Sequence, residues 1–111
     1  MGVQQWSEDT LVVRLTDDPE LSDDMDEVND RLKGVCCDVV LDLSDLGLLT
    51  SSGISKLLRL RKHQVEGGRR LVLCSPQDKV WGVLLATGLD ALFEFAETVS
   101  EALARLQAGK A

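Results

Sequence analysis

The sequence predicts an α/β fold with a largely parallel sheet, and three observations lead to that prediction. Short apolar runs rich in Val and Leu alternate along the chain with longer amphipathic segments. Glycine or proline stands at most of the boundaries between them. The chain also opens with two strand-like runs that have no helix between them. Alternation of this kind implies β-α-β units with parallel strands, and the opening pair adds an N-terminal β-hairpin.

The first third of the chain predicts the hairpin and one helix. Strands are expected over Val3–Trp6 and Thr10–Leu15, with residues 7–9 in the turn. A helix is expected from Pro19 to Lys33, because its apolar residues are 4, 3 and 4 positions apart and proline is tolerated in a first turn. Gly34 is placed to end it. The apolar residues of this helix are Leu21, Met25, Val28 and Leu32.

Three strand–helix pairs are expected after this first helix. Val35–Leu43 has the apolar density of a central strand, and Leu71–Cys74 is a second run of that kind. A weaker strand is expected near Leu92–Phe95. The helices that follow these strands are expected from about residue 54 to the glycines at 67 and 68, over 77–88 and over 98–107. The whole chain therefore predicts about four helices on one mostly parallel sheet.

The second helix is expected to bury one apolar face. Leu57, Leu58 and Val65 are predicted to face the core with Arg61 beside them, and Leu60 to point away. The residues predicted to lie toward solvent are Lys56, Arg59, Lys62 and His63.

Composition and charge exclude several classes of function. The net charge of −7 argues against binding to phosphate backbones and to anionic membrane surfaces. No secretory signal is visible, and no apolar run approaches the roughly 20 residues of a membrane-spanning helix. The chain therefore reads as a single cytoplasmic domain over residues 1–111, without membrane insertion or nucleic-acid binding.

Cysteine and histidine usage predicts no metal site and no cofactor. Cys36, Cys37 and Cys74 lie in apolar runs and are expected to be buried thiols of a reducing compartment. His63 is the only histidine, so the paired spacing that zinc requires is missing. Neither glycine-rich nucleotide-binding pattern occurs in the chain.

The turn between a predicted strand and the predicted second helix consists of Thr50, Ser51, Ser52 and Gly53. Sites of open α/β sheets lie at this end of the strands. One interpretation is structural, because Ser and Thr oxygens cap the free N–H groups of a first helical turn. Capping, however, does not require three hydroxyls and a glycine in a row. A phosphate added here would meet the positive end of the helix, and the glycine would leave this turn uncovered for a partner.

A serine hydrolase is the competing chemical interpretation, and the sequence argues against it. A nucleophilic serine needs a neighbouring base. His63 lies about 16 Å along the helix axis from Ser52, beyond its reach. The glycine that precedes the serine in a nucleophile elbow is also missing. We therefore expect no enzyme activity and assign no catalytic residues.

Five separated strings together carry a resemblance to a known family. They are LDL at 41–43, SSG at 51–53, EGG at 66–68, RLVLCSP at 70–76 and ATGLDALFEF at 86–95. In this order they resemble the STAS domain, in particular the anti-sigma factor antagonists of bacteria. The resemblance covers about residues 10–106 and is strongest over 35–106. It implies the STAS fold, a mostly parallel mixed sheet with about four helices and an N-terminal hairpin.

The resemblance implies a protein that switches partners, not an enzyme. Such a protein binds an anti-sigma factor that is itself a serine kinase, and so acts on transcription. Phosphorylation of one serine breaks the complex, and a phosphatase restores it. That serine falls on Ser51, with Ser52 as the alternative. The residues expected to contact the partner are Leu49, Thr50, Ser51, Ser52, Gly53 and Lys56.

One departure from the family pattern keeps a second function open. Thr50 stands where the family has an Asp before the serine. This favours a STAS adaptor or scaffold that is not phosphorylated and serves a signalling or lipid-transport assembly. The string SSG favours the phosphorylated switch. Leu46, Leu48, Leu49 and Leu60 are expected to form an exposed apolar docking patch near this turn.

Overall fold

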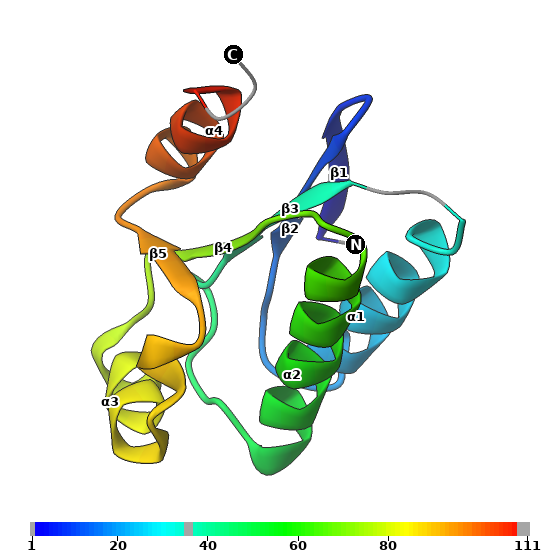
Figure 1. Ribbon diagram of the computed structural model, residues 1–111. Helices are drawn as coiled ribbons and strands as arrows, with labels where there is room; N and C mark the ends of the chain where they lie inside the picture. Colours follow the sequence, from blue (N-terminus) through cyan, green and yellow to red (C-terminus); the bar gives the residue numbers. More distant parts are fainter. Residues whose placement is uncertain (1, 35–36, 109–111) are drawn as a thin grey trace.

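The computed structural model describes residues 2–34 and 37–108, which form one sheet with helices on both faces (Figure 1). The strands are β1 (Val3–Ser7), β2 (Thr10–Arg14), β3 (Asp38–Asp42), β4 (Leu71–Cys74) and β5 (Glu94–Ala96). The helices are α1 (Glu20–Arg31), α2 (Ser51–Glu66), α3 (Asp78–Thr87) and α4 (Val99–Ala108), with a short 3-10 helix, η1 (Leu89–Ala91), after α3.

The sheet has the strand order β1-β2-β3-β4-β5. β1 pairs with β2 antiparallel, and every other neighbouring pair is parallel. One row of facing residues runs across the sheet through Val13, Leu41, Leu73 and Phe95. The predicted α/β fold, with a mostly parallel sheet, four helices and an N-terminal hairpin, is confirmed.

Alternate residues of the strands supply two separate cores. On one face, Val39 and Leu41 of β3 pack with apolar residues of α1, α2 and α3. On the other face, Val40 and Val72 pack against Ala102 and Leu106 of α4. All five residues of β3 are buried, as expected for a central strand covered on both faces.

The predicted core residues of α1 are confirmed. Leu21, Met25 and Val28 are buried in the helix, and Leu32 is buried just after it. Their spacing places them on one stripe, which faces the sheet and α2. At the surface between the two helices, Lys56 Nζ lies 3.4 Å from Asp26 Oδ1, so α1 and α2 are side by side.

The predicted core face of α2 is confirmed for Leu57 but wrong for its other leucines and for Val65. Leu60 is fully buried, while Leu58 and Val65 are 37% and 62% exposed. The face that enters the core consists of Gly53, Leu57, Leu60 and Gln64.

Gln64 explains this rotation of α2. Its buried side-chain amide donates hydrogen bonds to the carbonyl oxygens of Cys37, at 2.7 Å, and Arg70, at 2.9 Å. These carbonyls lie at the beginnings of β3 and β4, so the Gln64 side chain joins α2 to the sheet. A polar residue therefore occupies the core-facing side of α2, where apolar residues were expected.

Two strand boundaries differ from the prediction. β3 begins at Asp38 in the described chain, and Val35 and Cys36 lie outside the described residues. β5 comes later than predicted because η1 occupies residues 89–91 and Leu92 closes it with a hydrogen bond to the Leu89 carbonyl oxygen.

The expected burial of the thiols is confirmed for Cys37 and Cys74. Burial raises the pKa of the Cys74 thiol to about 12, and the nearby Asp42 charge acts in the same direction. Cys36 lies outside the described residues.

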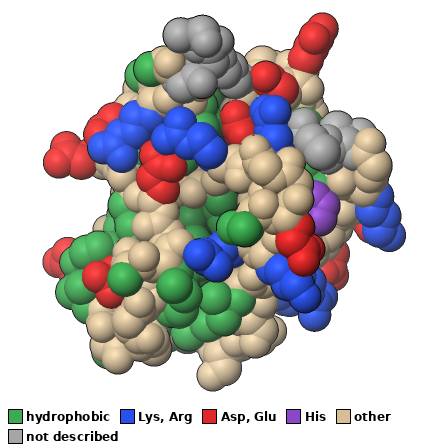
Figure 2. All heavy atoms as spheres, in the orientation of Figure 1, with side chains coloured by type: hydrophobic (Ala, Val, Ile, Leu, Met, Phe, Trp, Pro, Cys, Tyr) green, Lys and Arg blue, Asp and Glu red, His purple; other side chains and the backbone are tan. Residues whose placement is uncertain are grey.

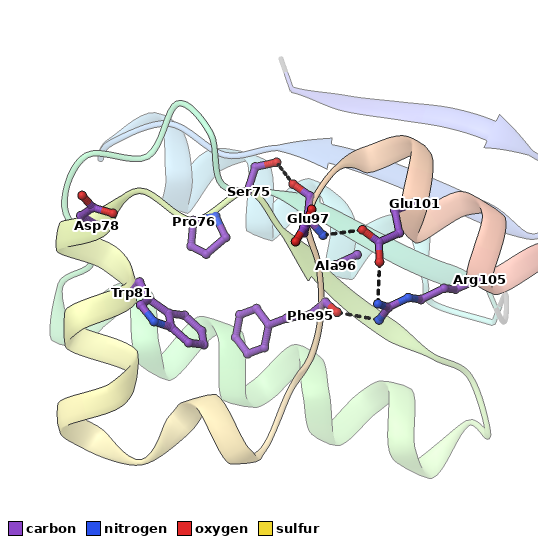
Figure 3. Close-up of a pocket in the computed structure, with 9 residues that line it drawn as sticks. All are labelled: Ser75, Pro76, Asp78, Trp81, Phe95, Ala96, Glu97, Glu101 and Arg105. Carbon is purple, nitrogen blue, oxygen red and sulfur yellow. Dashed lines mark hydrogen bonds and ion pairs between the residues drawn. The ribbon is translucent and has the colours of Figure 1, made fainter.

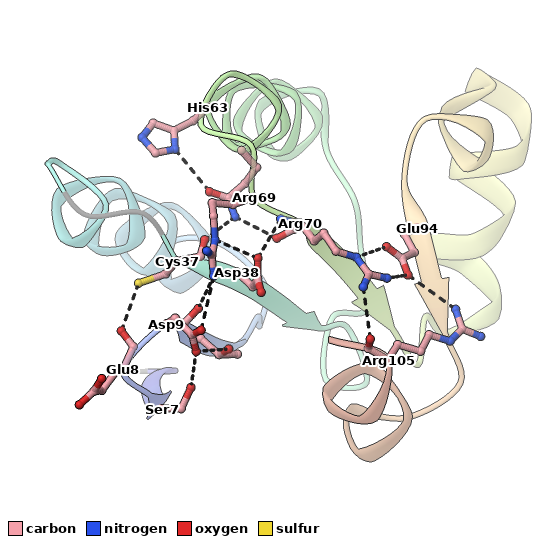
Figure 4. A network of polar contacts seen from close by, with 12 residues as sticks. Ser7, Glu8, Asp9, Cys37, Asp38, His63, Arg69, Arg70, Glu94 and Arg105 are labelled. Atoms are coloured by element: carbon pink, nitrogen blue, oxygen red, sulfur yellow. Dashed lines mark hydrogen bonds and ion pairs between the residues drawn. The ribbon is translucent and has the colours of Figure 1, made fainter. Parts of the chain in front are cut away.

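Ion pairs hold the amino ends of the parallel strands together (Figure 4). The carboxylate of Asp38 accepts a hydrogen bond from the Arg70 N–H at 3.0 Å and lies 3.1 Å from Arg69 Nε. Arg69 also donates to the carbonyl oxygen of Asp9, just before β2. The guanidinium of Arg70 pairs with Glu94, the first residue of β5. This cluster, here called the amino-end network, joins the starts of β2, β3, β4 and β5.

Candidate functional site

The predicted turn of hydroxyls lies at the opposite, carboxyl end of the sheet, where α2 begins. Thr50 is the residue that caps the helix: its Oγ1 accepts a hydrogen bond from the Gly53 N–H at 3.1 Å. Its backbone is extended, and its carbonyl oxygen accepts from the Ile54 N–H at 2.9 Å. The structural interpretation of the turn is therefore confirmed for Thr50.

Ser51 and Ser52 form the start of the first turn of α2, and both are exposed. Within residues 2–34 and 37–108, neither hydroxyl has a hydrogen-bond partner. The first turn of α2 also has no acidic residue, so its positive end is not balanced locally. Because Thr50 already supplies the cap, the two serine hydroxyls are free to react or to bind.

Ser51 and Ser52 face different neighbours. At 100° per residue, Ser51 lies on the same stripe as Leu58 and Lys62, away from the buried face of α2. Ser52 lies one turn before Lys56, which pairs with Asp26 of α1. Ser51 is therefore the more accessible of the two hydroxyls to another protein.

Gly53 is buried, and the expectation that it leaves the first turn uncovered is wrong. A Cβ atom at this position would lie 3.2 Å from Leu49 Cδ1 and 3.7 Å from Leu21 Cδ1. The missing side chain therefore allows α2 to approach α1 and the loop before it. In this structure the glycine serves internal packing.

The expectation of an exposed leucine patch is also wrong for three of its four members. Leu46 and Leu60 are fully buried and Leu49 is 5% exposed, while Leu48 is 61% exposed. A side chain as buried as Leu49 offers no surface to a partner. Leu49 is therefore removed from the expected contact set, and Leu48 is the leucine of this loop that faces solvent.

Lys56 is half-buried, and its ammonium group lies 3.4 Å from the Asp26 carboxylate. Part of its charge is therefore used between α1 and α2. Contact of Lys56 with a partner stays a prediction, as it does for Thr50, Ser51, Ser52 and Gly53.

Side chains from two other loops hold the segment that leads into the turn. Asp17 Oδ1 accepts hydrogen bonds from the Gly47 N–H at 2.9 Å and the Leu48 N–H at 3.1 Å. Gln77, the residue before α3, donates to the Ser44 carbonyl oxygen at 2.7 Å. Sequence reasoning missed both residues, because each is about 30 positions from the backbone groups it holds.

The described residues contain no set of three or more His, Cys, Asp or Glu side chains that could hold a metal ion. His63 lies three turns along α2 from the serines, on the exposed side, and its Nδ1 is 3.4 Å from Gln64 Oε1. In the described part of the chain, no helix combines the length and apolar character that crossing a membrane requires. What the turn offers is a pair of exposed hydroxyls on a fixed backbone.

Comparison with known proteins places this geometry in a family. The family model of the STAS domain matches residues 4–102, so this protein belongs to the STAS domain family. The resemblance inferred from the sequence is thereby confirmed.

Three solved structures share the fold. The anti-sigma factor antagonist SpoIIAA in its unphosphorylated form is 20% identical, with a TM-score of 0.82 over 96% of this chain and 95% of that one. An anti-sigma factor antagonist (STAS) domain protein from Planctomyces limnophilus is 21% identical, with a TM-score of 0.81 over 95% and 97%. The phosphorylated form of Bacillus SpoIIAA is 20% identical, with a TM-score of 0.74 over 93% and 96%.

Proposed function

We propose that this protein is an anti-sigma factor antagonist that switches partners through phosphorylation of Ser51. Its first partner is an anti-sigma factor that is a serine kinase, and its second is a phosphatase. Both belong to the cytoplasm of a bacterial cell, where the chain serves as one STAS domain over residues 1–111. The observation that carries the proposal is the exposed, unbonded Ser51 hydroxyl at the start of α2.

The chemistry requires no catalytic group from this chain. The kinase transfers the γ-phosphoryl group of ATP to Ser51 Oγ, and the hydroxyl proton passes to a base of the kinase. The phosphatase hydrolyses the ester and restores the hydroxyl. The protein contributes a substrate serine on a rigid turn, held by Thr50, Asp17 and Gln77. We therefore propose that it is not an enzyme.

Charge explains how the modification would release the partner. A phosphoserine adds about −1.5 to −2 charges at neutral pH. The first turn of α2 tolerates this charge, because the free N–H groups of a helix start favour anions. The partner surface that packed against a neutral hydroxyl would have to accept a buried dianion, so the complex would separate while the fold persists.

Similarity to SpoIIAA supports this proposal, since that protein has been described in both an unphosphorylated and a phosphorylated form. The decisive measurement is phosphosite mapping by mass spectrometry on protein isolated from its native cells under changing conditions. We expect phosphate on Ser51 that varies with condition and disappears in Ser51→Ala. The matched control, Ser52→Ala, should retain it. Absence of phosphate in every condition would contradict the proposal.

A second candidate function is favoured by Thr50. The family Asp before the serine is absent, and Thr50 is occupied as the helix cap. A STAS adaptor without phosphorylation, in a signalling or lipid-transport assembly, needs only the docking surface and no acidic residue beside Ser51. This candidate predicts that Ser51→Asp leaves partner affinity unchanged, whereas the phosphorylation switch predicts that it weakens the complex.

A further inference from the structure

A groove between α3 and α4 lies apart from the hydroxyl turn. It has a volume of about 470 Å³ and opens beside β5 (Figure 3). Its lining comes from the segment after β4, from α3, from β5 and from α4. Ser51 and its neighbours do not line it, so the groove is not explained by the proposed function.

The floor of the groove is aromatic. Trp81 of α3 and Phe95 of β5 meet edge to face, with ring centroids 5.1 Å apart. They are two of only four aromatic residues in the chain, and both are partly exposed although they also pack on the core. Aromatic side chains that are half open in a concave surface are typical of a site that an apolar group fills.

The rim of the groove is acidic. Arg105 pairs with Glu101 at 2.6 Å and also donates to the Phe95 carbonyl oxygen at 2.7 Å. The N–H of Glu97 and, less strongly, Arg105 lower the pKa of Glu101. In the described parts of the chain, Asp78 and Glu97 have no cation paired with them. The groove therefore presents uncompensated negative charge beside an apolar floor, which suits an occupant that is both apolar and basic.

The walls of the groove are fixed before anything binds. Ser75 has a left-handed backbone, with φ of 56°, and its Oγ donates to the Glu97 carbonyl oxygen at 2.7 Å. The Glu97 N–H in turn donates to Glu101 at 3.0 Å. Figure 3 shows these bonds linking the segment after β4 to α4. Because Arg105 already occupies the Phe95 carbonyl on the edge strand, we expect recognition through side chains and not by addition of a strand.

One surface of this same chain has the complementary chemistry. Leu58 and Val65 of α2 are exposed, with exposed Lys62 between them on the same side of the helix. Arg61 lies beside them and donates to the Leu92 carbonyl oxygen at 2.9 Å. We call Leu58, Arg61, Lys62 and Val65 the α2 outer stripe. Figure 2 shows apolar side chains gathered where α2 and α3 meet, with basic side chains among them.

The basic character of the stripe contrasts with the rest of the chain. From Ser51 to Val65, α2 has four lysines and arginines and no acidic residue, although the whole chain carries a net charge of −7. No carboxylate in the described residues pairs with Lys62. In the described residues, Asp78 and Glu97 of the apolar groove and Lys62 of the apolar stripe thus have no side chain of opposite charge paired with them.

We propose that the groove of one molecule receives the α2 outer stripe of a second copy of this chain. Leu58 or Val65 supplies the group that covers Trp81 and Phe95, and Lys62 meets the Asp78 and Glu97 carboxylates. The two surfaces differ, so the contact is head to tail and either closes into a ring or continues as a chain. Along the helix axis, Leu58 lies about 10 Å and Val65 about 21 Å from Ser51.

Charge reversal at both surfaces tests this contact. Sedimentation velocity over a range of concentrations should show association of the wild type. Glu97→Lys and Lys62→Glu should each weaken association about tenfold, as expected when an attractive pair becomes repulsive. An equimolar mixture of the two variants should associate again, because each pairing between them has opposite charges. Glu8→Lys, an equal charge change on the exposed hairpin, is the control and should behave as the wild type.

Fluorescence gives a second readout at the groove. In a Trp6→Phe background, Trp81 is the single tryptophan, and its emission should shift to shorter wavelength as the protein concentration rises. Replacement of both Leu58 and Val65 by serine should abolish the shift without changing the fold, because either side chain can cover the aromatic floor. A protein that stays monomeric at all concentrations, or association that neither charge variant changes, would overturn the proposal. Restoration by mixing would establish it.

Discussion

The two ends of the parallel sheet use polar side chains in different ways. At the amino end, Asp38, Arg69, Arg70 and Glu94 bond mainly to one another across neighbouring strands. At the carboxyl end Arg14 pairs with Asp42 and Asp45, but the side chains that hold the hydroxyl turn bond to loop backbone. At the amino end, the charged side chains are therefore used within the amino-end network. At the carboxyl end, the polar side chains fix the loop backbone, and the hydroxyls of Ser51 and Ser52 have no hydrogen bonds in the described residues. One end of the sheet can thus stabilise the fold while exposed hydroxyls stay available at the other end.

This difference predicts that substitutions at the amino end change the free energy of unfolding, whereas substitutions at the carboxyl end change partner binding.

Gly53 is the exception, because it lies at the carboxyl end but is buried. Gly53→Leu should give the largest loss of folding free energy, about 3 kcal/mol, since its side chain would overlap Leu49 and Leu21. Urea denaturation measures this loss. Gly82→Leu, at an exposed helix position with no atom near its Cβ, is the control and should cost little. Full stability of Gly53→Leu would show that the turn can open.

Asp38→Asn tests the amino-end network. The variant keeps the shape of the side chain but removes the charge that lies beside the Arg69 guanidinium and accepts from the Arg70 backbone N–H. We expect a loss of about 2 kcal/mol in the free energy of unfolding, because Asp38 is buried and its partners lose a charged acceptor. Phosphorylation of Ser51 should proceed at the wild-type rate. A large change in that rate would mean that the two ends of the sheet are coupled.

Changes at Thr50 separate the capping role of the turn from its proposed role as a kinase substrate. Thr50→Ala should lower the free energy of unfolding by about 1 kcal/mol, because the Gly53 N–H loses its acceptor. Thr50→Ser keeps the acceptor and should retain most of the stability. Thr50→Asp keeps a cap and adds the acidic residue of the family pattern. If the kinase needs that acid, phosphorylation of Ser51 becomes faster in Thr50→Asp, which a phosphate incorporation assay measures.

Asp17→Asn should separate binding from stability most clearly. The carboxylate is exposed, so its loss should cost about 1 kcal/mol or less in folding. The amide oxygen of Asn can still accept from the Gly47 and Leu48 N–H groups, but both hydrogen bonds lose their charged acceptor and weaken. Partner affinity should therefore fall by more than the stability change explains. Asp18→Asn, the same change one residue later, is the control, since Asp18 bonds to Ser22 of α1. Equal effects of both variants on calorimetric affinity would point to net charge alone.

The effect that is smallest at neutral pH concerns the Cys74 thiol. The pKa of the Cys74 thiol is about 12 in the folded protein and near 9.0 otherwise. Above pH 9 the unfolded chain therefore releases a proton that the folded chain retains, and this favours unfolding as pH rises toward 12. The contribution is absent at neutral pH and reaches about 1.4 kcal/mol near pH 10. Cys74→Ala should show a shallower loss of stability over this range, and identical slopes would contradict the assignment.

The sequence was sufficient for the order of elements because their periodic patterns are local. The 4, 3, 4 spacing in α1 identified its buried residues correctly. The same reasoning failed in α2, where Leu57, Leu58 and Leu60 are compatible with more than one face. The choice depends on Gln64, whose two hydrogen bonds to the strand starts cannot be read from its residue type.

In the candidate site, as in the helices, the local features could be predicted from the sequence and the packing between distant segments could not. The position of the turn, its exposed serines and the capping by Thr50 all follow from the strand-to-helix junction. The burial of Gly53 and Leu49 does not, because it depends on how closely α1 packs. The bonds from Asp17 and Gln77 join distant segments of the chain, and no spacing rule indicates them.

The cap made by Thr50 has a consequence for the timing of a signal. The Thr50–Gly53 hydrogen bond does not involve the Ser51 hydroxyl. Under the proposed function we therefore expect this bond to persist when phosphate is added or removed, and both forms to share one backbone. No refolding step stands between modification and response. The response would then depend only on the current phosphorylation state of Ser51. The rates of the kinase and the phosphatase alone would set how quickly the protein switches between its two forms.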